Sequence, residues 1–422
     1  MTTTPPSTLS PREIRRAWTM LIIITMLTTA GMTVVLPILP FVVLRYVDEP
    51  AHLALWVGVL ETVNALCAFF AAPLLGRLSD RFGRCPIIVV AAFGAVIGYL
   101  LFGIGGSIWI LLLGRIVQGA TAGDLPALFA YLADITPPEQ RAKRFGLLGA
   151  LSGIGTMVGP ALGGLLAAID IALPVFATAG FALVIAILSL FLLPESLVPA
   201  KRTPKLDLHA LHPFGAFRQA FGRPELRGLL IGIVLVSLPF GFFVNNFSVL
   251  ALDSIAWGPT AIGLLVACVG IVDILIQGLL LGLLLPRIGE RGVIVSGIVA
   301  QATGLIALAV VASLFAQPWL FIVGALGLAA GQGAATATMD GVLSNAVGDD
   351  EQGWLAGTAQ SLNSAIGMVA PLLAGVLYAG IAHAAPYLLG AALMVGAAIV
   401  ISRTRFRDAA KPVDAPEPAL AQ

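Results

Sequence analysis

Five ionisable side chains lie inside long apolar stretches of this 422-residue chain, in which only 11% of the residues are charged. They are Glu61, Arg115, Asp124, Asp273 and Asp340. An apolar environment favours the neutral form of a carboxyl group, whereas a nearby cation favours the charged form. Arg115 keeps its proton and therefore needs a permanent partner or a polar cavity. The set predicts a site within the membrane where carboxylates, chiefly Glu61 and Asp273, gain and lose protons. The alternative is that these groups form a fixed ion pair or a protonated carboxyl that is hydrogen-bonded within the core.

Polar and aromatic side chains accompany the embedded charges. Gln118 follows Arg115 by three residues and Gln277 follows Asp273 by four, spacings that put both members on one helix face. Apolar and aromatic surface with a few hydrogen-bonding groups suits an amphipathic ligand. The candidate ligand contacts are Thr28, Gln118, Phe243, Asn246, Gln277, Gln360 and Asn363. Packing within the core or toward lipid is the alternative for each.

A charged segment, Gly76–Arg84, separates two of the apolar stretches. Its three arginines and one aspartate cannot lie in lipid, so they mark a membrane surface. Gly76 and Gly83 are expected to permit a tight turn there. A weaker copy, Gly282–Arg291, begins 206 residues later, and Gly83 aligns with Gly289 in it. The charged candidates at this surface are Asp80, Arg81, Arg84 and Asp134.

A glycine- and proline-rich stretch forms a third group of candidates: Gly155, Gly159, Pro160, Gly163 and Gly164. Proline removes one helical hydrogen bond and kinks a helix, while small residues let membrane helices approach closely. The segment Gly159–Gly164 matches Ala370–Gly375, 211 residues further on. The chain therefore contains an internal duplication.

Twelve apolar stretches must position these residues. The mean hydropathy of the chain is +1.00, and about 20 apolar residues are needed to cross a bilayer. The expected spans are 18–44, 53–75, 86–105, 108–133, 145–168, 172–193, 228–252, 260–285, 292–313, 318–345, 353–379 and 385–402. A membrane β-barrel would instead show alternating segments of about 10 residues. The sequence thus predicts an all-α polytopic membrane protein.

The twelve spans are expected to form two pseudo-symmetric six-helix halves with a path between them. The expected divisions are 1–193, a cytoplasmic linker 194–227, 228–402 and a disordered tail 403–422. With the N-terminus inside, Arg45 lies in an outer loop and Arg115 in a helix, and the other 21 (23 − 2) Lys and Arg residues lie on the cytoplasmic side. Both termini are therefore predicted to be cytoplasmic.

Several kinds of chemistry are disfavoured. Cys67, Cys85 and Cys268 have no paired spacing, and the four histidines are scattered, so no metal site or disulfide is expected. A phosphate-binding Gly-Lys loop is absent from the sequence, which argues against ATP-driven transport by this chain alone. A polytopic membrane enzyme or a non-transporting receptor is a remote alternative, and nucleic acid is not an expected partner.

The motifs of the first half carry a family resemblance. They are the loop Gly76–Arg84, the segment Gly114–Gly123 around Arg115, the segment Gly149–Gly164 and the segment Leu36–Pro40. With these motifs the chain resembles the major facilitator superfamily, specifically its twelve-helix drug:proton antiporter branch. Ser79–Arg84, Ala133–Thr136 and Leu193–Ser196 are similar to the tetracycline–proton antiporters.

The chain departs from the tetracycline–proton antiporters at four positions in the spans. Thr28, Gly98 and Gln301 stand where those transporters carry acidic residues, and Asp273 stands where they carry a histidine. The resemblance therefore implies the fold and the antiport, but not tetracycline as the substrate.

The resemblance implies proton-coupled efflux of small amphipathic or hydrophobic compounds by alternating access, driven by the proton gradient without a cofactor. It also implies that Asp80 and nearby charges latch the halves in one state. Export of one native metabolite is the alternative, followed by proton-coupled uptake of a polar solute. The expected setting is a bacterial inner membrane, with a monomer whose partners are its substrate, protons and the lipid bilayer.

Overall fold

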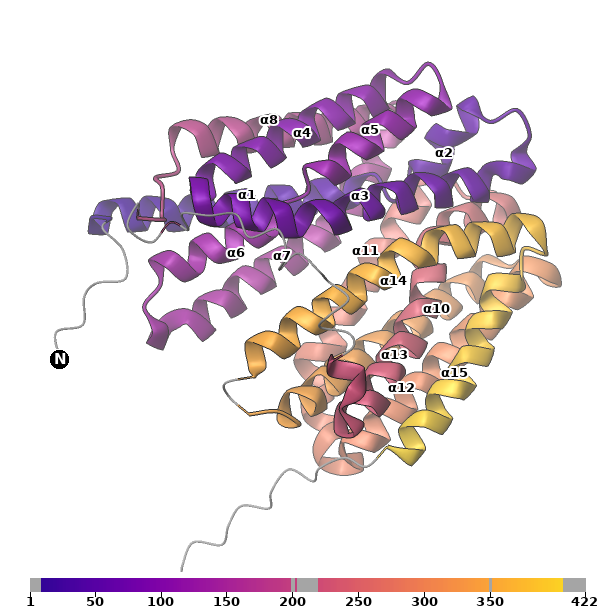
Figure 1. Cartoon of the computed structure of the whole chain (residues 1–422). Coiled ribbons are helices and arrows are strands. Elements are labelled where there is room, and N and C mark those ends of the chain that lie inside the picture. The colour runs from indigo at the N-terminus through magenta and orange to yellow at the C-terminus, as the bar shows by residue number, and fades with distance from the viewer. Residues whose placement is uncertain (1–8, 199–201, 203–218, 349–350, 405–422) are drawn as a thin grey trace, which may run out of the picture.

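The computed structural model of the chain describes residues 9–198, 202, 219–348 and 351–404, and within these every regular element is a helix (Figure 1). The first half contains α1 (Pro11–Val34), α2 (Leu39–Val43), α3 (Leu53–Phe82), α4 (Arg84–Ile104), α5 (Ile108–Ala120), α6 (Asp124–Ile135), α7 (Pro138–Ala167) and α8 (Leu173–Phe191). Two short 3-10 turns, Leu44–Tyr46 and Pro50–His52, join α2 to α3. The chain enters α1 through a capping box, in which Ser10 and Glu13 satisfy each other's backbone N–H groups.

The second half contains α10 (Pro224–Ile255), α11 (Pro259–Leu275), a π-helical turn η5 (Ile276–Leu280), α12 (Leu281–Ser313), α13 (Pro318–Asn345), α14 (Gln352–Gly380) and α15 (Ala385–Arg403). Helix α10 starts at Pro224, four residues before the start expected for the seventh span. Most of the expected linker and nearly all of the expected disordered tail lie outside the described residues.

Eleven helical stretches of the described chain are long and apolar enough to cross a membrane. One of them, Pro259–Ser313, has 55 residues and at 1.5 Å per residue would be about 80 Å long, more than twice the hydrocarbon thickness. It turns at Gly289, whose φ of 68° is not helical. This stretch therefore supplies two spans, and the prediction of a twelve-span all-α membrane protein is confirmed.

Two expected spans are interrupted. Residues 35–38, which include Pro37, separate α1 from α2, and residues 121–123 separate α5 from α6. The second break precedes Pro126, which cannot donate a helical hydrogen bond to the carbonyl of Ala122.

The expectation that Gly76 helps to form the turn after the second span is wrong, because α3 continues through it to Phe82. A Cβ atom on Gly76 would meet nothing within 4 Å. Gly83 alone makes the turn, with a φ of 115° that only glycine adopts easily. Gly289, its partner in the repeat, has a positive φ as well.

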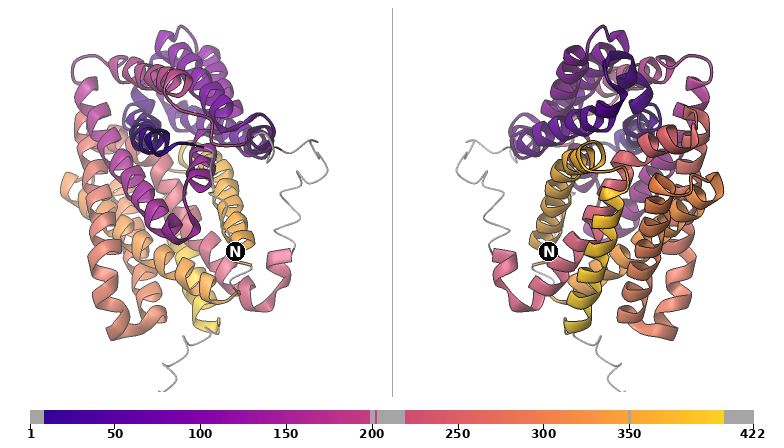
Figure 2. Two further views of the ribbon diagram at one scale, coloured as in Figure 1. Left: turned by 90° about the vertical axis from the view of Figure 1, so that its left-hand side faces the viewer. Right: turned by 90° about the vertical axis from the view of Figure 1, so that its right-hand side faces the viewer.

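The two halves meet near one face of the molecule and diverge toward the other (Figures 1 and 2). We call the face that carries Gly83 and the start of α1 the Gly83 face, and the face that carries His52 and the end of α14 the His52 face. Near the His52 face, the ends of α3 and α14 pack together, as do those of α7 and α11.

These two seams repeat each other. A Cβ atom on Gly375 of α14 would lie 2.6 Å from the backbone oxygen of Ala54, and a Cβ atom on Gly164 of α7 would lie 2.7 Å from that of Pro259. Gly164 and Gly375 are the matched ends of the duplicated segment. The sequence repeat thus builds two equivalent close contacts between the halves.

The seams do not extend to the Gly83 face. Cβ atoms on Gly146, Gly149 and Gly153, in the part of α7 nearest that face, would meet nothing within 4 Å. The same holds for Gly278 of the π-helical turn and Gly357 of α14. The structure is therefore closed between the halves at the His52 face and open at the Gly83 face.

Candidate functional site

An ion pair between Glu61 of α3 and Arg115 of α5 occupies the interior of the first half. The Arg115 guanidinium donates to a Glu61 carboxylate oxygen at 2.7 Å. The Arg115 side chain is 8% exposed and that of Glu61 is 21% exposed. Arg115 also donates to the Gln118 side-chain oxygen at 3.2 Å and lies 4.9 Å from the centre of the Phe102 ring. Asn64 donates to the Arg115 backbone oxygen at 3.1 Å. These contacts hold the guanidinium in one orientation.

The pair lines a cavity of about 150 Å³, which we call the N-half cavity. Five of the residues singled out in the sequence come together here from four helices: Thr28, Glu61, Arg115, Gln118 and Asp124. Asp124 is the first residue of α6 and borders the break in the fourth span.

Asp273 lies in the second half, on α11, two residues before the end of this helix at Leu275, where the π-helical turn follows. Its carboxylate accepts from the Gln277 amide at 2.9 Å, and a Cβ atom on Gly333 of α13 would collide with it. Asp273, Gln277 and Phe243 line a cavity of about 330 Å³, the Asp273 cavity. The Phe243 ring lies 6.1 Å from that of Phe240 and 5.4 Å from that of Phe247, so one wall is aromatic.

Asp340 and Asn363 line a third cavity of about 430 Å³, the Asp340 cavity. Phe240, Val244 and Thr336 belong to the walls of both this cavity and the Asp273 cavity. The two cavities are therefore neighbours in one open region of the second half.

A small cavity joins the halves. It is bordered by Leu36 and Glu61 from the first half and by Val244 and Asn245 from the second. Leu36 also lines the N-half and Asp273 cavities. This series of cavities thus shares wall residues: the small cavity has Leu36 and Glu61 in common with the N-half cavity, Leu36 and Val244 with the Asp273 cavity, and Val244 and Asn245 with the Asp340 cavity.

Two of the proposed ligand contacts lie outside this series. Asn246 is buried and donates to the Ala374 backbone oxygen at 2.9 Å, so it packs α10 against α14. Gln360 is exposed on α14. Asn245, the neighbour of Asn246, lines two of the cavities instead. The sequence prediction therefore chose the right helix but, at Asn246, a residue on the wrong face of it.

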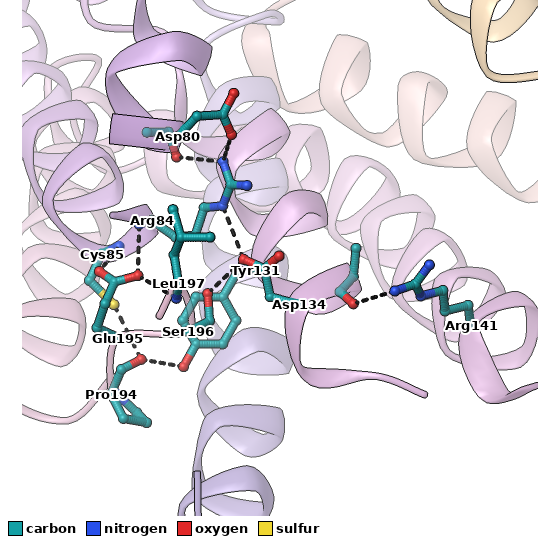
Figure 3. A network of polar contacts seen from close by, with 12 residues as sticks. Asp80, Arg84, Cys85, Tyr131, Asp134, Arg141, Pro194, Glu195, Ser196 and Leu197 are labelled. Carbon is teal, nitrogen blue, oxygen red and sulfur yellow. Dashed lines mark hydrogen bonds and ion pairs between the residues drawn. The ribbon is translucent and has the colours of Figure 1, made fainter. Parts of the chain in front are cut away.

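The charges at the Gly83 face form a network within the first half (Figure 3). Arg84 donates to Asp80 at 2.6 Å and to Asp134 at 3.1 Å. Ser196 donates to Asp134 at 3.0 Å. Arg81 lies outside these contacts, with its guanidinium 5.2 Å from the centre of the Phe82 ring.

Glu195 is the central residue that the sequence did not single out. Its carboxylate accepts from the backbone N–H groups of Arg84 at 2.9 Å and Cys85 at 3.1 Å, the first two residues of α4. A Cβ atom on Gly83 would collide with this carboxylate. Glu195 therefore caps α4, where the helix dipole favours an anion, and it ties the end of the sixth span to the turn at Gly83.

The glycine-rich α7 packs along α1. Cβ atoms on Gly155 and Gly159 would collide with the hydroxyls of Thr29 and Thr33, and one on Gly163 would collide with the backbone of Val34. On another side of α7, the Pro160 backbone oxygen lies against Gly263 of α11. Helix α7 is thus held between the core of its own half and the seam with the other half.

Comparison with known proteins agrees with this architecture. The family model for the Major Facilitator Superfamily matches residues 21–255 and 229–420. The tetracycline resistance protein, class C, of Escherichia coli is 35% identical over 375 residues, which cover 89% of this chain and 92% of that protein. Multidrug resistance protein 2 of Bacillus subtilis (strain 168) is 27% identical, covering 82% and 85%.

Solved structures show the same fold. The crystal structure of the nucleoside transporter NupG superposes with a TM-score of 0.70 at 15% sequence identity, covering 93% of this chain and 98% of that one. At this identity the likeness concerns the fold alone. The resemblance seen in the sequence motifs is confirmed: the chain belongs to the Major Facilitator Superfamily, in which it is related to the tetracycline and multidrug resistance proteins.

Proposed function

We propose that this protein exports small amphipathic compounds in exchange for protons, by alternating access across a bacterial inner membrane. One observation carries the proposal. The cavity of the Glu61–Arg115 pair, a place to bind a proton, shares the wall residue Leu36 with the aromatic-walled Asp273 cavity, a place to bind an apolar body. The relation of this chain to tetracycline and multidrug resistance proteins of the same family supports export as the direction of transport.

The distribution of positive charge supports an orientation with the Gly83 face in the cytoplasm, because lysine and arginine concentrate in cytoplasmic loops. In that orientation the open state described above faces inward. The halves would then rock about the two seams to open the His52 face, as parallel-repeat transporters do. Both kinds of cavity are complete within one chain, which supports a monomer as the working unit.

Exchange follows from the ion pair. When Glu61 is ionised, Arg115 holds it at 2.7 Å; when Glu61 takes a proton, the attraction is lost and Arg115 needs another anion or water. Asp124 lines the same cavity and can attract the freed guanidinium. Protonation of Glu61 thereby changes the contacts between α3, α5 and α6. For exchange, the protonated state of Glu61 must alternate with the substrate-bound state of the protein.

The substrate site is proposed to be the joined Asp273 and Asp340 cavities. Their described walls carry two carboxylates and no lysine or arginine, an arrangement that attracts cationic or neutral compounds with aromatic bodies. A strongly polar solute would leave the phenylalanine wall unused, so uptake of such a solute is disfavoured.

The network at the Gly83 face is proposed to steady the first half when that face closes. Asp80 is already held by Arg84, so closure would add a contact from the second half to an anion fixed in place. An Asp80→Ala protein with normal membrane levels and unchanged turnover would rule this role out.

Transport in inside-out vesicles tests the proposal. A pH gradient is imposed, a pH-sensitive dye is enclosed, and lipophilic cations, neutral drugs and tetracycline are added in turn. We expect at least one compound to dissipate the gradient in vesicles with the protein and not in empty ones, and Asp273→Asn to reduce this response. No response to any compound, with folded protein present, would contradict proton-coupled efflux of this substrate class.

A further inference from the structure

Three buried polar atoms, on residues that line the N-half cavity, have no hydrogen-bond partner among the described residues. They are the Thr28 hydroxyl, the Arg115 Nε and the Gln118 side-chain nitrogen. Their residues are 5%, 6% and 9% exposed, respectively, and all three line the cavity. Leaving a buried donor unsatisfied costs about 1–3 kcal/mol. Three such donors around one space indicate that the space holds an acceptor.

The backbone beside the cavity supports the same reading. Residues 121–123 leave the helical path between α5 and α6, and Thr121 and Ala122 line the cavity. Pro126 cannot donate to the Ala122 carbonyl. Irregular backbone at membrane depth is tolerated where it is buried in protein or lines a water-filled cavity. The N–H groups of Thr121, Ala122 and Gly123 all have backbone acceptors, so the Ala122 carbonyl is the backbone group that water in this cavity would satisfy, together with the three side chains.

The size of the cavity separates water from larger occupants. About 150 Å³ corresponds to about five water molecules at ~30 Å³ each. The Asp273 and Asp340 cavities are at least twice as large. We therefore assign solvent to the N-half cavity and substrate to the two larger cavities, with Leu36 in the walls of both the N-half and the Asp273 cavities.

The ionisable groups around the cavity come from four helices. Glu61 lies on α3, Tyr99 on α4, Arg115 on α5 and Asp124 on α6. The cavity walls from α1 and α8 carry no ionisable group; their polar residues are Thr28 and Thr178, and the Thr178 hydroxyl donates to the Pro174 backbone oxygen at 2.9 Å. The cavity thus has two carboxylates, one beside the arginine and one at the helix break.

We propose that the N-half cavity holds a chain of water molecules that carries protons between Glu61 and Asp124. This inference rests on the proposed proton exchange. In the state open at the Gly83 face, protonated Glu61 gives its proton to the adjoining water, the water chain passes one proton along, and ionised Asp124 accepts it. Glu61 ends as a carboxylate paired with Arg115, and Asp124 ends protonated until it loses the proton toward the Gly83 face. Thr28 and Gln118 are positioning residues that hold the water.

Hydration can be tested without transport. Radiolytic hydroxyl-radical labelling of the full-length protein in nanodiscs marks side chains beside bound water, and Tyr99 is the reporter in the cavity. Tyr131 is the reference, because it is fully buried and donates to the Pro194 backbone oxygen. We expect Tyr99 to be labelled at least five-fold faster than Tyr131. Equal labelling of the two tyrosines would mean a dry cavity and would overturn the inference.

A matched pair of variants fills or keeps the space. Ala95 of α4 lines the cavity; Ala95→Leu places an apolar side chain in it, whereas Ala95→Ser leaves room and adds a hydroxyl. We expect Tyr99 labelling to fall to the Tyr131 level in Ala95→Leu and to stay within two-fold of wild type in Ala95→Ser. If a transported compound, rather than Ala95→Leu, suppresses Tyr99 labelling, the cavity binds substrate and the proposal is wrong.

The role of Asp124 is tested by proton release from purified protein in weakly buffered solution, followed with a pH dye after addition of a tetraphenylphosphonium salt or another compound active in vesicles. Asp124→Asn should slow release at least ten-fold while the Kd for the compound changes less than two-fold. Release at the wild-type rate would remove Asp124 from the route. If wild type releases no proton with any compound, the proposed exchange fails, and the labelling result still decides whether the cavity is hydrated.

Discussion

The backbone oxygen of Pro371 lies so close to Gly58 that a Cβ atom on residue 58 would collide with it. The same relationship holds in the other seam, between the backbone oxygen of Pro160 and Gly263. Thr62 adds a hydroxyl that donates to the Met368 backbone oxygen at 3.1 Å and accepts from the Leu372 N–H at 3.0 Å. The closed side of the molecule thus depends on glycines that face the proline-containing helices α7 and α14 of the opposite half.

Gly58→Leu should prevent the α3–α14 seam from closing and so depopulate the state described here. The leucine would collide with the Pro371 backbone, which cannot move aside as the end of a flexible side chain could. We therefore expect transport to fall at least ten-fold. The state can be followed by the distance between spin labels on Gly76→Cys and Gly357→Cys, in a protein without its three native cysteines. Both positions face open space near the Gly83 face, and their distance should shorten.

Gly180→Leu is the matched control, because a Cβ atom at this exposed position of α8 would meet nothing within 4 Å. It should leave both transport and the label distance unchanged. An unchanged distance in Gly58→Leu would show that the seam tolerates a side chain and that closure does not depend on it.

Glu61→Gln should uncouple transport from the proton gradient. The amide keeps the shape of the side chain but cannot lose a proton or neutralise Arg115, and removing one member of a buried pair leaves the other charge uncompensated. We expect the stimulation of transport by an imposed pH gradient to drop at least ten-fold. Exchange of labelled for unlabelled substrate without a gradient should continue, because the Asp273 cavity is untouched.

The comparison variant is Glu49→Gln, whose carboxylate is exposed near His52 on the His52 face. It should respond to the gradient as wild type does. A Glu61→Gln protein that still responds fully to the gradient would place the coupling carboxylate elsewhere, with Asp273 and Asp340 as the next positions to substitute.

The pairing of Arg115 with an embedded carboxylate could be predicted from the sequence, because an arginine in an apolar span needs a permanent partner or a polar cavity; Asp273 and Asp340 instead lie apart from it in the second half. The rotation of each helix could not be predicted. Asn245 and Asn246 are adjacent, yet only Asn245 lines the cavities, since successive helical residues point about 100° apart. The break at 121–123 was hidden within an apolar stretch that has the length of one span.

Glu195 illustrates a different limit. Its partner Arg84 is 111 residues away, so only the packed fold reveals that it caps α4. The sequence motif that contains Glu195 indicated a family resemblance. No local pattern, however, predicts that a carboxylate after the sixth span caps the helix of the third span.

Glu195→Ala should destabilise the first half, because three backbone N–H groups, those of Arg84, Cys85 and Leu197, would lose their acceptor. Loss of a helix cap costs about 0.5–2 kcal/mol. We expect a lower unfolding temperature in detergent, with Glu195→Gln intermediate since one oxygen remains. Glu139→Ala, at an exposed position in the first turn of α7, should lower the unfolding temperature less, because it removes only an exposed charge from the helix dipole and no cap. Equal unfolding temperatures for the Glu195 and Glu139 variants would mean that solvent replaces the cap without loss.

Phe243→Ala should weaken binding of aromatic substrates. Phe243 is buried, lines the Asp273 cavity and lies between the rings of Phe240 and Phe247, so truncation removes the middle of the aromatic wall. An aromatic contact contributes about 0.5–1.5 kcal/mol beyond the area that it buries. We therefore expect the Kd for aromatic compounds to rise about ten-fold, which corresponds to a loss of about 1.4 kcal/mol of binding free energy.

The Kd is measured by equilibrium binding of a radiolabelled compound that is active in vesicles, with Phe315→Ala as control. Phe315 is exposed just after α12, near the His52 face, so its loss should not change the Kd. Phe243→Leu should restore part of the affinity for aliphatic compounds but not for aromatic ones, because leucine replaces the apolar volume without the ring. If all three variants bind aromatic compounds as wild type does, the substrate does not touch this wall, and the Asp340 cavity becomes the site to test.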